Sequence, residues 1–211
     1  AVAAEHDRSV VVAGVYGIFN VFETLLSAAG ARLWERVQFA DVMGGGDPWV
    51  SGVVVDSRGN IIVTGGLRAP LHFPTRTLTS AGDMDIFVAK FSSEGVNLWA
   101  FRLGGAGTDY PVSVEVSPLD GGVFTGGFEG TVDLGGGPLV SAGDKDAFIA
   151  IYSADGGYQS ARAFGGPGTD VGISATFDAG GNVLLAGVFE GTVDFGDGPL
   201  TSAGDQDIFV V

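Results

Sequence analysis

Short apolar runs separated by glycine-rich turns follow one another along the chain. From position 111, PVSVEV is followed by the turn LDGG, by VFTGGF, by a long glycine-rich connection and by DAFIAIYS. The turn SADGG then leads to a fourth run, YQSARAF, and to GGPGTD. Runs of roughly five to eight residues bounded by turn residues are typical of β-strands, and no stretch has a helical period long enough to compete. The pattern predicts four strands in such a unit.

Several of these runs lack the alternation of apolar and polar residues that a half-buried strand shows. IIVTGG at 61–66 and FIAIY at 148–152 are examples. A strand covered on both faces has such a continuous apolar run, whereas a strand with one face in water alternates. We therefore expect sheets that stack face to face.

The units recur at a fixed spacing. SAGD, followed by one residue and Asp, begins at positions 80, 141 and 202, and 141 − 80 = 202 − 141 = 61. GGAGTD and GGPGTD begin at 104 and 165, and 165 − 104 = 61. A fixed period is typical of repeat architectures. Four-stranded antiparallel units repeated in this way predict an all-β β-propeller with about one blade per repeat.

The period predicts nearly four blades in a single segment, 1–211, with approximate units 1–47, 48–109, 110–170 and 171–211. The first unit is degenerate, because its connection between the second and third strands is shorter and lacks SAGDxD. From Gly14 to Phe22 it spans 22 − 14 = 8 positions, whereas the equivalent connection from Gly65 to Phe87 spans 87 − 65 = 22. The last unit stops after its third strand. An open stack would expose apolar faces, which a monomer rarely does. We therefore expect a fragment of a larger propeller, or self-association with another copy that completes the ring.

The motifs of the later units resemble a known repeat family. In order they are GGxGTD, D-x-x-GN, IIVTGG, GTVDFGxGPLTSAG, D-x-DIFVAKF and G-x-x-LW, and the match is best from Asp56 to Val211. The pattern closely resembles the bacterial β-propeller repeat, often called the seven-bladed or SBBP-type repeat. The resemblance implies a β-propeller in a secreted or surface-attached bacterial protein. It implies no catalytic residues.

The charge and composition of the chain limit the classes of partner and of metal site that we expect. The chain has 25 Asp and Glu against 10 Lys and Arg, for a formal net charge of -15, and it has no Cys. Such a charge disfavours nucleic acid and anionic membrane surfaces as partners. Without Cys, disulfides and thiolate metal sites are excluded. No apolar run approaches the roughly 18 residues of a membrane span. The first residues, AVAAEHDRS, lack the regions of a signal peptide, so we expect any export signal outside this chain.

Strand order predicts where the acidic residues gather. In an up-and-down four-stranded blade, the connection from strand two to strand three and the connection to the next blade leave from the same face. The repeated aspartates of both connections should share that face, which we call the acidic loop face: Asp83, Asp85, Asp109, Asp133, Asp144, Asp146, Asp170, Asp194, Asp205 and Asp207. We expect ligand or protein contacts there, with four candidate binding residues: Asp109, Asp133, Asp170 and Asp194.

The D-x-D pairs are candidate Ca²⁺ ligands, because oxygen ligands at alternate positions suit this ion. The pairs are Asp83 with Asp85, Asp144 with Asp146, and Asp205 with Asp207. The alternative is structural, since Asp beside Gly commonly bonds to its own backbone in a turn. GGAGTD matches the first six positions of a Ca²⁺-binding nonapeptide, but the copies at 104 and 165 are a full repeat apart rather than in tandem, which favours a glycine turn.

Trp49 is a further candidate binding residue. It stands just before the first strand of the second unit, where we interpret it as an aromatic without a repeat counterpart that is exposed by position. Trp34 and Trp99, by contrast, occupy equivalent fourth-strand positions, which favours a role in covering the gap between blades.

Catalysis is not expected from this sequence. It contains neither a G-x-S-x-G elbow nor an HExxH helix, and most of its acids recur with the repeat, whereas catalysis needs a pair made distinct by its environment. The predicted function is a non-catalytic binding or structural module of a secreted or cell-surface bacterial protein. The alternative is part of a carbohydrate-active enzyme or sugar-binding propeller whose key residues lie in other blades.

Overall fold

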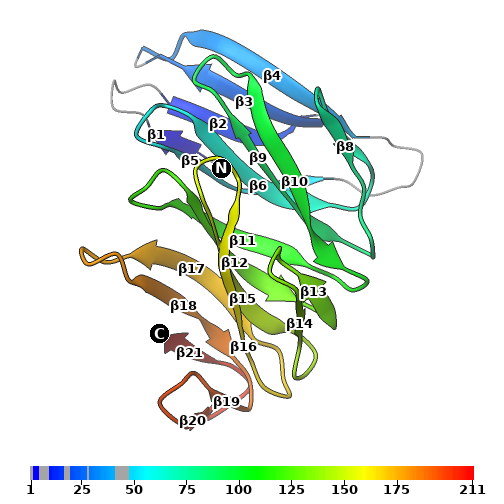
Figure 1. The fold of residues 1–211 in the computed structure, drawn as a ribbon, viewed down its shortest axis with the longest axis vertical. Coiled ribbons are helices and arrows are strands. Elements are labelled where there is room, and N and C mark those ends of the chain that lie inside the picture. Colours follow the sequence, from blue (N-terminus) through cyan, green and yellow to red (C-terminus); the bar gives the residue numbers. More distant parts are fainter. Residues whose placement is uncertain (1, 5–9, 17–19, 28, 41–47) are drawn as a thin grey trace.

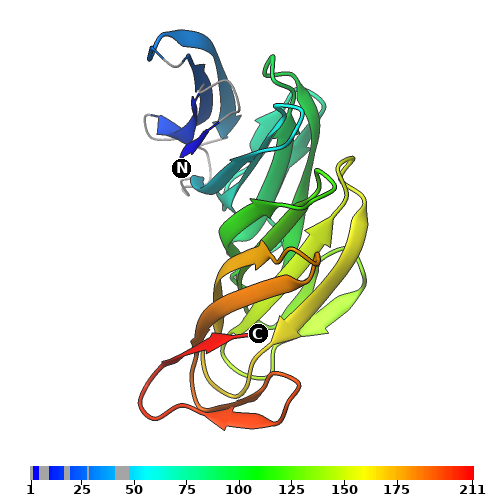
Figure 2. The ribbon, with the colours of Figure 1, turned by 90° about the vertical axis from the view of Figure 1, so that its left-hand side faces the viewer.

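The computed structural model describes residues 2–4, 10–16, 20–27, 29–40 and 48–211. These residues form antiparallel strands arranged in several sheets (Figure 1), which confirms the predicted all-β class. The sheets are stacked in chain order, with the first and last at opposite ends of the stack in both views (Figures 1 and 2).

Each sheet is built mainly from consecutive strands. The first contains β1 (Val2–Ala4), β2 (Val10–Tyr16), β3 (Asn20–Leu26) and β4 (Arg32–Ala40). The second contains β5 (Trp49–Val55), β6 (Ile61–Leu67), β9 (Asp85–Phe91) and β10 (Asn97–Gly105). The third contains β11 (Tyr110–Val116), β12 (Gly122–Phe128), β15 (Asp146–Tyr152) and β16 (Tyr158–Phe164). The fourth contains β17 (Val171–Phe177), β18 (Val183–Phe189) and β21 (Asp207–Val210).

The long connection between the second and third strands of a sheet forms a β-hairpin, which the sequence analysis treated as a loop. The hairpins are β7 (Leu71–Phe73) with β8 (Arg76–Leu78), β13 (Thr131–Asp133) with β14 (Pro138–Val140), and β19 (Thr192–Asp194) with β20 (Pro199–Thr201). The first two extend the preceding sheet, because β7 pairs with β4 and β13 pairs with β10. The β19–β20 hairpin is a separate two-stranded sheet.

Three apolar clusters hold the stack together, one between each pair of neighbouring sheets. All residues of β6, β9 and β12 are buried, which confirms the expectation of sheets covered on both faces. Close approach requires glycine at some positions between the sheets. A Cβ on Gly172 would lie 1.8 Å from Thr125 Oγ1 of the third sheet.

Candidate functional site: the acidic loop face

The two connections expected to share a face lie side by side. β13, in the connection from β12 to β15, pairs with the end of β10, where Gly104 lies opposite Asp133. In the next sheet, the Glu190 amide donates to Asp170 Oδ1 at 3.0 Å. The two kinds of connection therefore meet on one face, as the strand order predicted.

Asp109 and Asp170, which close the GGxGTD corners, are fully buried. Asp109 Oδ2 accepts a hydrogen bond from the Gly105 amide at 2.6 Å, and Asp170 Oδ2 accepts one from the Gly166 amide at 2.8 Å. Their own amides donate at 2.8 Å to the carbonyls of Met84 and Lys145 respectively. Both aspartates therefore fasten the corner between two sheets to the SAGDxD turn. Their predicted role in ligand binding stays a prediction.

The two aspartates of each D-x-D pair have different surroundings. Asp83, Asp144 and Asp205 are exposed. The second members begin β9, β15 and β21, and each accepts a hydrogen bond from the amide of the alanine in its own SAGD motif. The distances are 2.7 Å for Asp85, 3.2 Å for Asp146 and 2.7 Å for Asp207. The second aspartate thus closes the SAGD turn, which is the structural role that the sequence left as the alternative.

An arginine is paired with one of these turns and not with the next. Arg102 Nη1 lies 2.5 Å from Asp85 Oδ2 and also donates to the Gly104 carbonyl at 3.2 Å. Its counterpart one repeat later (102 + 61 = 163) is Ala163, so Asp146 lacks this partner. Among buried side-chain oxygens of the described residues, Oδ1 of Asp85 and Oδ1 of Asp109 have no hydrogen-bond partner.

Burial raises the pKa of three of these carboxyl groups. The pKa of Asp109 rises to about 6, chiefly because burial disfavours its charge, and the nearby charge of Asp85 adds to the effect. The Gly105 amide and Arg102 oppose this rise. Burial also raises the pKa of Asp146 and of Asp170, with smaller contributions from the neighbouring charges of Asp170 and Glu190 respectively.

Asp133 and Asp194 lie in the exposed hairpins and order the turns there. Asp133 Oδ1 accepts hydrogen bonds from the amides of Gly135 at 2.7 Å and Gly137 at 3.2 Å. Asp194 Oδ1 accepts the equivalent bonds at 2.8 Å and 3.2 Å. Both aspartates are exposed, so each keeps its second oxygen available while the first holds the turn.

The described carboxylates do not form a ready cation cage. Within the described ranges, no group of three or more His, Cys, Asp or Glu side chains is arranged to hold a metal ion. The members of a D-x-D pair also differ, since one is exposed and the other is engaged by a backbone amide. This arrangement does not fit a preformed Ca²⁺ site, and Ca²⁺ binding stays a prediction.

Trp49 packs on glycine and has an aromatic counterpart, so its interpretation as an unmatched aromatic was wrong. It is the first residue of β5 rather than the residue before it, and it is half-buried rather than exposed as expected, because its ring lies over Gly66, where an added Cβ would be 2.3 Å from the indole. Tyr110 lies in the same way over Gly127, one repeat later (49 + 61 = 110; 66 + 61 = 127). Applying the period to this cross-strand pair would have found the match. Nothing in this packing tests whether Trp49 binds a ligand.

The opposite face of the stack holds a buried ion pair that the sequence analysis missed. Lys90 Nζ lies 2.7 Å from Asp56 Oδ2, and both side chains are almost fully buried. Lys90 also donates to the Asp120 carbonyl at 3.0 Å and to the Ala154 carbonyl at 3.2 Å, both in turns of the third sheet. The signal in the sequence was a single Lys inside the apolar run DIFVAKF. Lys90 thereby joins the second sheet to the third.

Comparisons with known proteins support the propeller-like interpretation in its general form. No protein family model matches the chain. An uncharacterized WD repeat-containing protein of Acanthamoeba polyphaga mimivirus is 28% identical over 170 residues. That match covers 66% of this chain, which spans only 12% of the relative's length. The all-β architecture and this relative together indicate a β-propeller-like repeat protein. The SBBP type stays a prediction.

A solved structure resembles the whole chain only loosely. It is a protein of unknown function from Bacteroides caccae, with a TM-score of 0.47 and 11% sequence identity, and the likeness covers 100% of this chain and 59% of that one. The described part of this chain contains no helix long and apolar enough to cross a membrane.

Proposed function

We propose that this chain is a non-catalytic interaction or scaffold module that binds partners through its acidic loop face. The proposal includes a propeller of nearly four blades in this chain, built from SBBP-type repeats with the period 141 − 80 = 61. It also includes a secreted or cell-surface setting in a bacterium. These finer points rest on the motif resemblance, whereas the general role is supported by the WD repeat-containing relative.

The observation that carries the proposal is the division of roles among the aspartates of one face. Asp85, Asp109, Asp146 and Asp170 are buried and hold turns in place through backbone amides. Asp83, Asp133, Asp144, Asp194 and Asp205 are exposed on the same connections. A rigid row of exposed negative charges steers and orients a positively charged partner. We therefore expect the partner to be a protein with a Lys- and Arg-rich surface.

The buried carboxylates support a structural role rather than a catalytic one. A raised pKa in a cleft is a reason to suspect catalysis, but structural networks raise pKa values as well. Here Asp109 and Asp170 accept hydrogen bonds from the amides of their own corners. The pKa is raised in both successive corners, as a repeated turn would produce.

The experiment compares two charge-neutralised variants for binding to an immobilised Lys- and Arg-rich peptide. The first variant carries Asp83→Asn, Asp144→Asn and Asp205→Asn on the acidic loop face. The matched control carries Glu94→Gln, Asp155→Asn and Asp178→Asn, which are exposed in turns of the opposite face. Both remove three charges, so net charge is held equal.

We expect the first variant to bind about tenfold more weakly than the wild type, since each exposed charge contributes roughly 0.2–1 kcal/mol. The control variant should bind like the wild type apart from a small general effect of net charge. An equal loss of peptide affinity in both variants, or a wild type that does not bind the peptide, would contradict the proposal. Hydrolysis of any member of a glycan panel by the wild type would instead support the carbohydrate-active alternative.

A further inference from the structure

A groove lies beside β10, the outer strand of the second sheet, where the chain departs from its own repeat. It has a volume of about 310 Å³ and is lined by β10, by the tip of the β7–β8 hairpin and by the turn between β15 and β16. Its walls include Arg76 from the hairpin, Leu98 and Trp99 from β10, and Asp155 from the turn. The second and third sheets, which lie on either side of it, each contain all four strands of a unit. We call this hollow the outer groove.

A difference between two repeats leaves this space open. In the third sheet, Tyr158 at the start of β16 lies over Gly135 and Gly136, so its ring fills the gap between the hairpin and the outer strand. The counterpart of Tyr158 in the second sheet is the shorter Asn97 (158 − 61 = 97). Asn97 Oδ1 accepts a hydrogen bond from the Thr75 hydroxyl at 3.1 Å. Asn97 therefore ties the hairpin to β10 without filling the gap.

The hairpin tip brings a positive charge to the outer groove. Arg76 is exposed, and its counterpart in the next repeat is Gly137 (76 + 61 = 137). Arg76 Nη1 donates to the Ala100 carbonyl at 3.0 Å, which holds the side chain against β10. Among the described residues, no carboxylate forms an ion pair with Arg76. A guanidinium has five N–H donors, so most of those of Arg76 remain for a ligand.

The turn of the third sheet brings a carboxylate to the same groove. Asp155 is exposed, and its Oδ1 accepts a hydrogen bond from the Ser153 hydroxyl. This bond, together with one from the Gly157 amide, lowers the pKa of Asp155, so the group is ionised at neutral pH. Within the described part of the chain, Asp155 has no cationic partner. The groove therefore has a hydrogen-bond donor on one element and an acceptor on another.

The apolar part of the groove is held in one arrangement. Trp99 Nε1 donates to the Ala154 carbonyl at 3.2 Å, and its ring stacks on Phe101 with centroids 5.1 Å apart. Gly156 packs on the indole, since an added Cβ there would lie 3.1 Å from the ring. Leu98 beside it is 49% exposed. A fixed apolar wall with a few placed polar groups is typical of small-molecule sites.

We propose that the outer groove binds a short neutral oligosaccharide. A sugar hydroxyl donates to a carboxylate and accepts from a guanidinium, so one sugar satisfies both Asp155 and Arg76. The apolar faces of sugar rings pack on side chains such as Trp99 and Leu98. The formal net charge of -15 disfavours an anionic ligand, and Arg76 within the groove disfavours a cationic one. The volume is at the low end for ligand sites, which suits a disaccharide.

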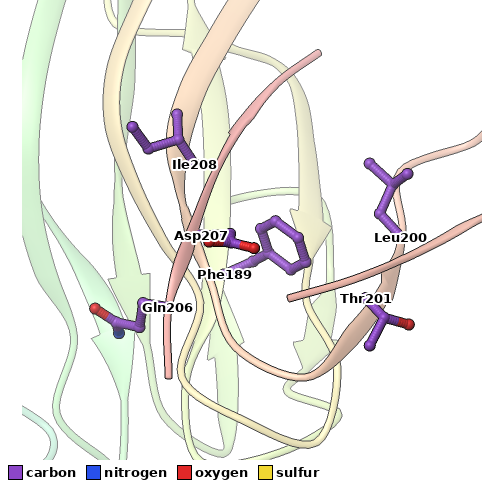
Figure 3. Close-up of a pocket in the computed structure, with 6 residues that line it drawn as sticks. All are labelled: Phe189, Leu200, Thr201, Gln206, Asp207 and Ile208. Atoms are coloured by element: carbon purple, nitrogen blue, oxygen red, sulfur yellow. The ribbon is translucent and has the colours of Figure 1, made fainter. Parts of the chain in front are cut away.

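Another hollow lacks this combination of groups. Figure 3 shows it between the β19–β20 hairpin and the ends of β18 and β21, with Phe189, Leu200 and Asp207 among its lining residues. The residues that line it include no Lys or Arg. Asp207 is already engaged, because its Oδ2 accepts a hydrogen bond from the Ala203 amide at 2.7 Å. We therefore expect the sugar in the outer groove and not there.

The first experiment is calorimetric titration of the intact chain with maltose, cellobiose and lactose. We expect at least one of these disaccharides to bind, with Kd on the order of a millimolar. Arg76→Gln and Asp155→Asn should each weaken binding roughly tenfold, because each removes hydrogen bonds to a charged group. The matched controls are Arg68→Gln and Asp178→Asn, which are exposed and do not line the groove. Both should bind like the wild type.

The second experiment closes the groove. Asn97→Tyr should abolish sugar binding, because the ring would fill the gap as Tyr158 does in the third sheet. Asn97→Ala loses the same hydrogen bond to Thr75 but leaves the gap open, so it should still bind. Circular dichroism establishes that the sheets of each variant are formed. Unchanged binding by a folded Asn97→Tyr, or a wild type that binds none of the three disaccharides, would overturn the proposal.

These outcomes are independent of the acidic loop face. The variant with Asp83, Asp144 and Asp205 neutralised keeps the outer groove intact, so it should bind the disaccharide while its peptide binding is lost. Asp155→Asn should show the reverse. A failure of either proposal is therefore seen separately from a failure of the other.

Discussion

Asp109 holds the GGAGTD corner in place, although its buried environment opposes ionisation of its carboxyl group. Its Oδ2 accepts a hydrogen bond from the Gly105 amide, whereas its Oδ1 is buried without a hydrogen-bond partner. Asp170 in the next corner makes both bonds, since Glu190 donates to its Oδ1 at 3.0 Å. Burial is the main cause of the raised pKa in both groups, and at Asp109, where the pKa rises to about 6, the nearby charge of Asp85 adds to it.

The raised pKa of Asp109 makes stability fall as pH rises through a defined window. Its pKa is about 6 in the folded chain and near 3.8 when unfolded, so the folded state binds more protons between these values. Stability therefore decreases from about pH 4 to about pH 6, and the cost is complete above that range. Asp109→Asn keeps an acceptor for Gly105 and removes the charge, so we expect it to be about 1–3 kcal/mol more stable than the wild type at pH 7.

Urea unfolding at pH 4 and pH 7 provides the measurement. The gain from Asp109→Asn should shrink toward zero at pH 4, where the wild-type carboxyl is largely protonated. Asp144→Asn, at an exposed position of the neighbouring D-x-D pair, is the matched control and should change little. A variant that is no more stable than the wild type at pH 7 would contradict this account.

Lys90 illustrates how a single polar residue can specify the packing of two elements. Burial alone would raise the pKa of Asp56, but hydrogen bonds from Lys90, Asn60 and the Arg58 amide outweigh it and lower that pKa. The contribution of Asp56 is therefore present above its unfolded pKa and is lost as pH falls through its lower folded value. The carbonyls of Asp120 and Ala154 satisfy the remaining Lys90 protons, so the cation fits only when both sheets are in register.

At the scale of elements, glycine permits the close approach of neighbouring sheets. Gly172 of β17 lies against Thr125 of β12, with an added Cβ only 1.8 Å from the hydroxyl oxygen. Thr125 itself is fixed, because it is buried and donates to the Phe148 carbonyl at 2.6 Å. The hydroxyl cannot move aside without losing that bond.

Gly172→Ala should therefore force the third and fourth sheets apart. We expect a loss of roughly 1–3 kcal/mol in the free energy of unfolding, as for other overpacked cores. Gly204→Ala is the control, because an added Cβ there has no atom within 4 Å and its backbone has no positive φ. Thermal unfolding of both variants gives the comparison, and equal midpoints would show that the sheets can adapt.

Strands were predictable where their apolar runs were long, and hairpins were missed where the runs were short. β6 and β12 are seven-residue strands buried throughout, which continuous runs such as IIVTGG reveal. The strands β13 and β14 have three residues each and are separated by glycines, so their sequence is typical of a loop. Pairing of β13 with β10 depends on contacts between distant residues, which local patterns do not contain.

The candidate site was predictable in position but not in its division of roles. Strand order alone placed the repeated aspartates on one face. It could not show that Asp109 is buried and Asp133 exposed, because burial depends on which hairpin covers which corner. The aromatic at Trp49 was misjudged for a similar reason, since its match to Tyr110 is visible only when aromatic and glycine are taken as a cross-strand pair.

At the scale of the whole molecule, the repeat places carboxylates of the same kind at successive sheets of the stack. The acidic loop face runs along the stack and carries exposed carboxylates.

Ca²⁺ binding by this face can be tested against the turn roles seen in the structure. Each D-x-D pair offers one exposed carboxylate and one that is held by an alanine amide. A cation would meet few protein ligands there, so we expect any affinity to be weak, with Kd on the order of a millimolar. Calorimetry on the intact chain should show this weak binding, and Asp144→Ala with Asp146→Ala should reduce its stoichiometry. Asp155→Ala with Asp178→Ala on the opposite face should leave the stoichiometry of Ca²⁺ binding unchanged. If titration of the wild type with Ca²⁺ produced no heat, the prediction that this face binds Ca²⁺ would be wrong.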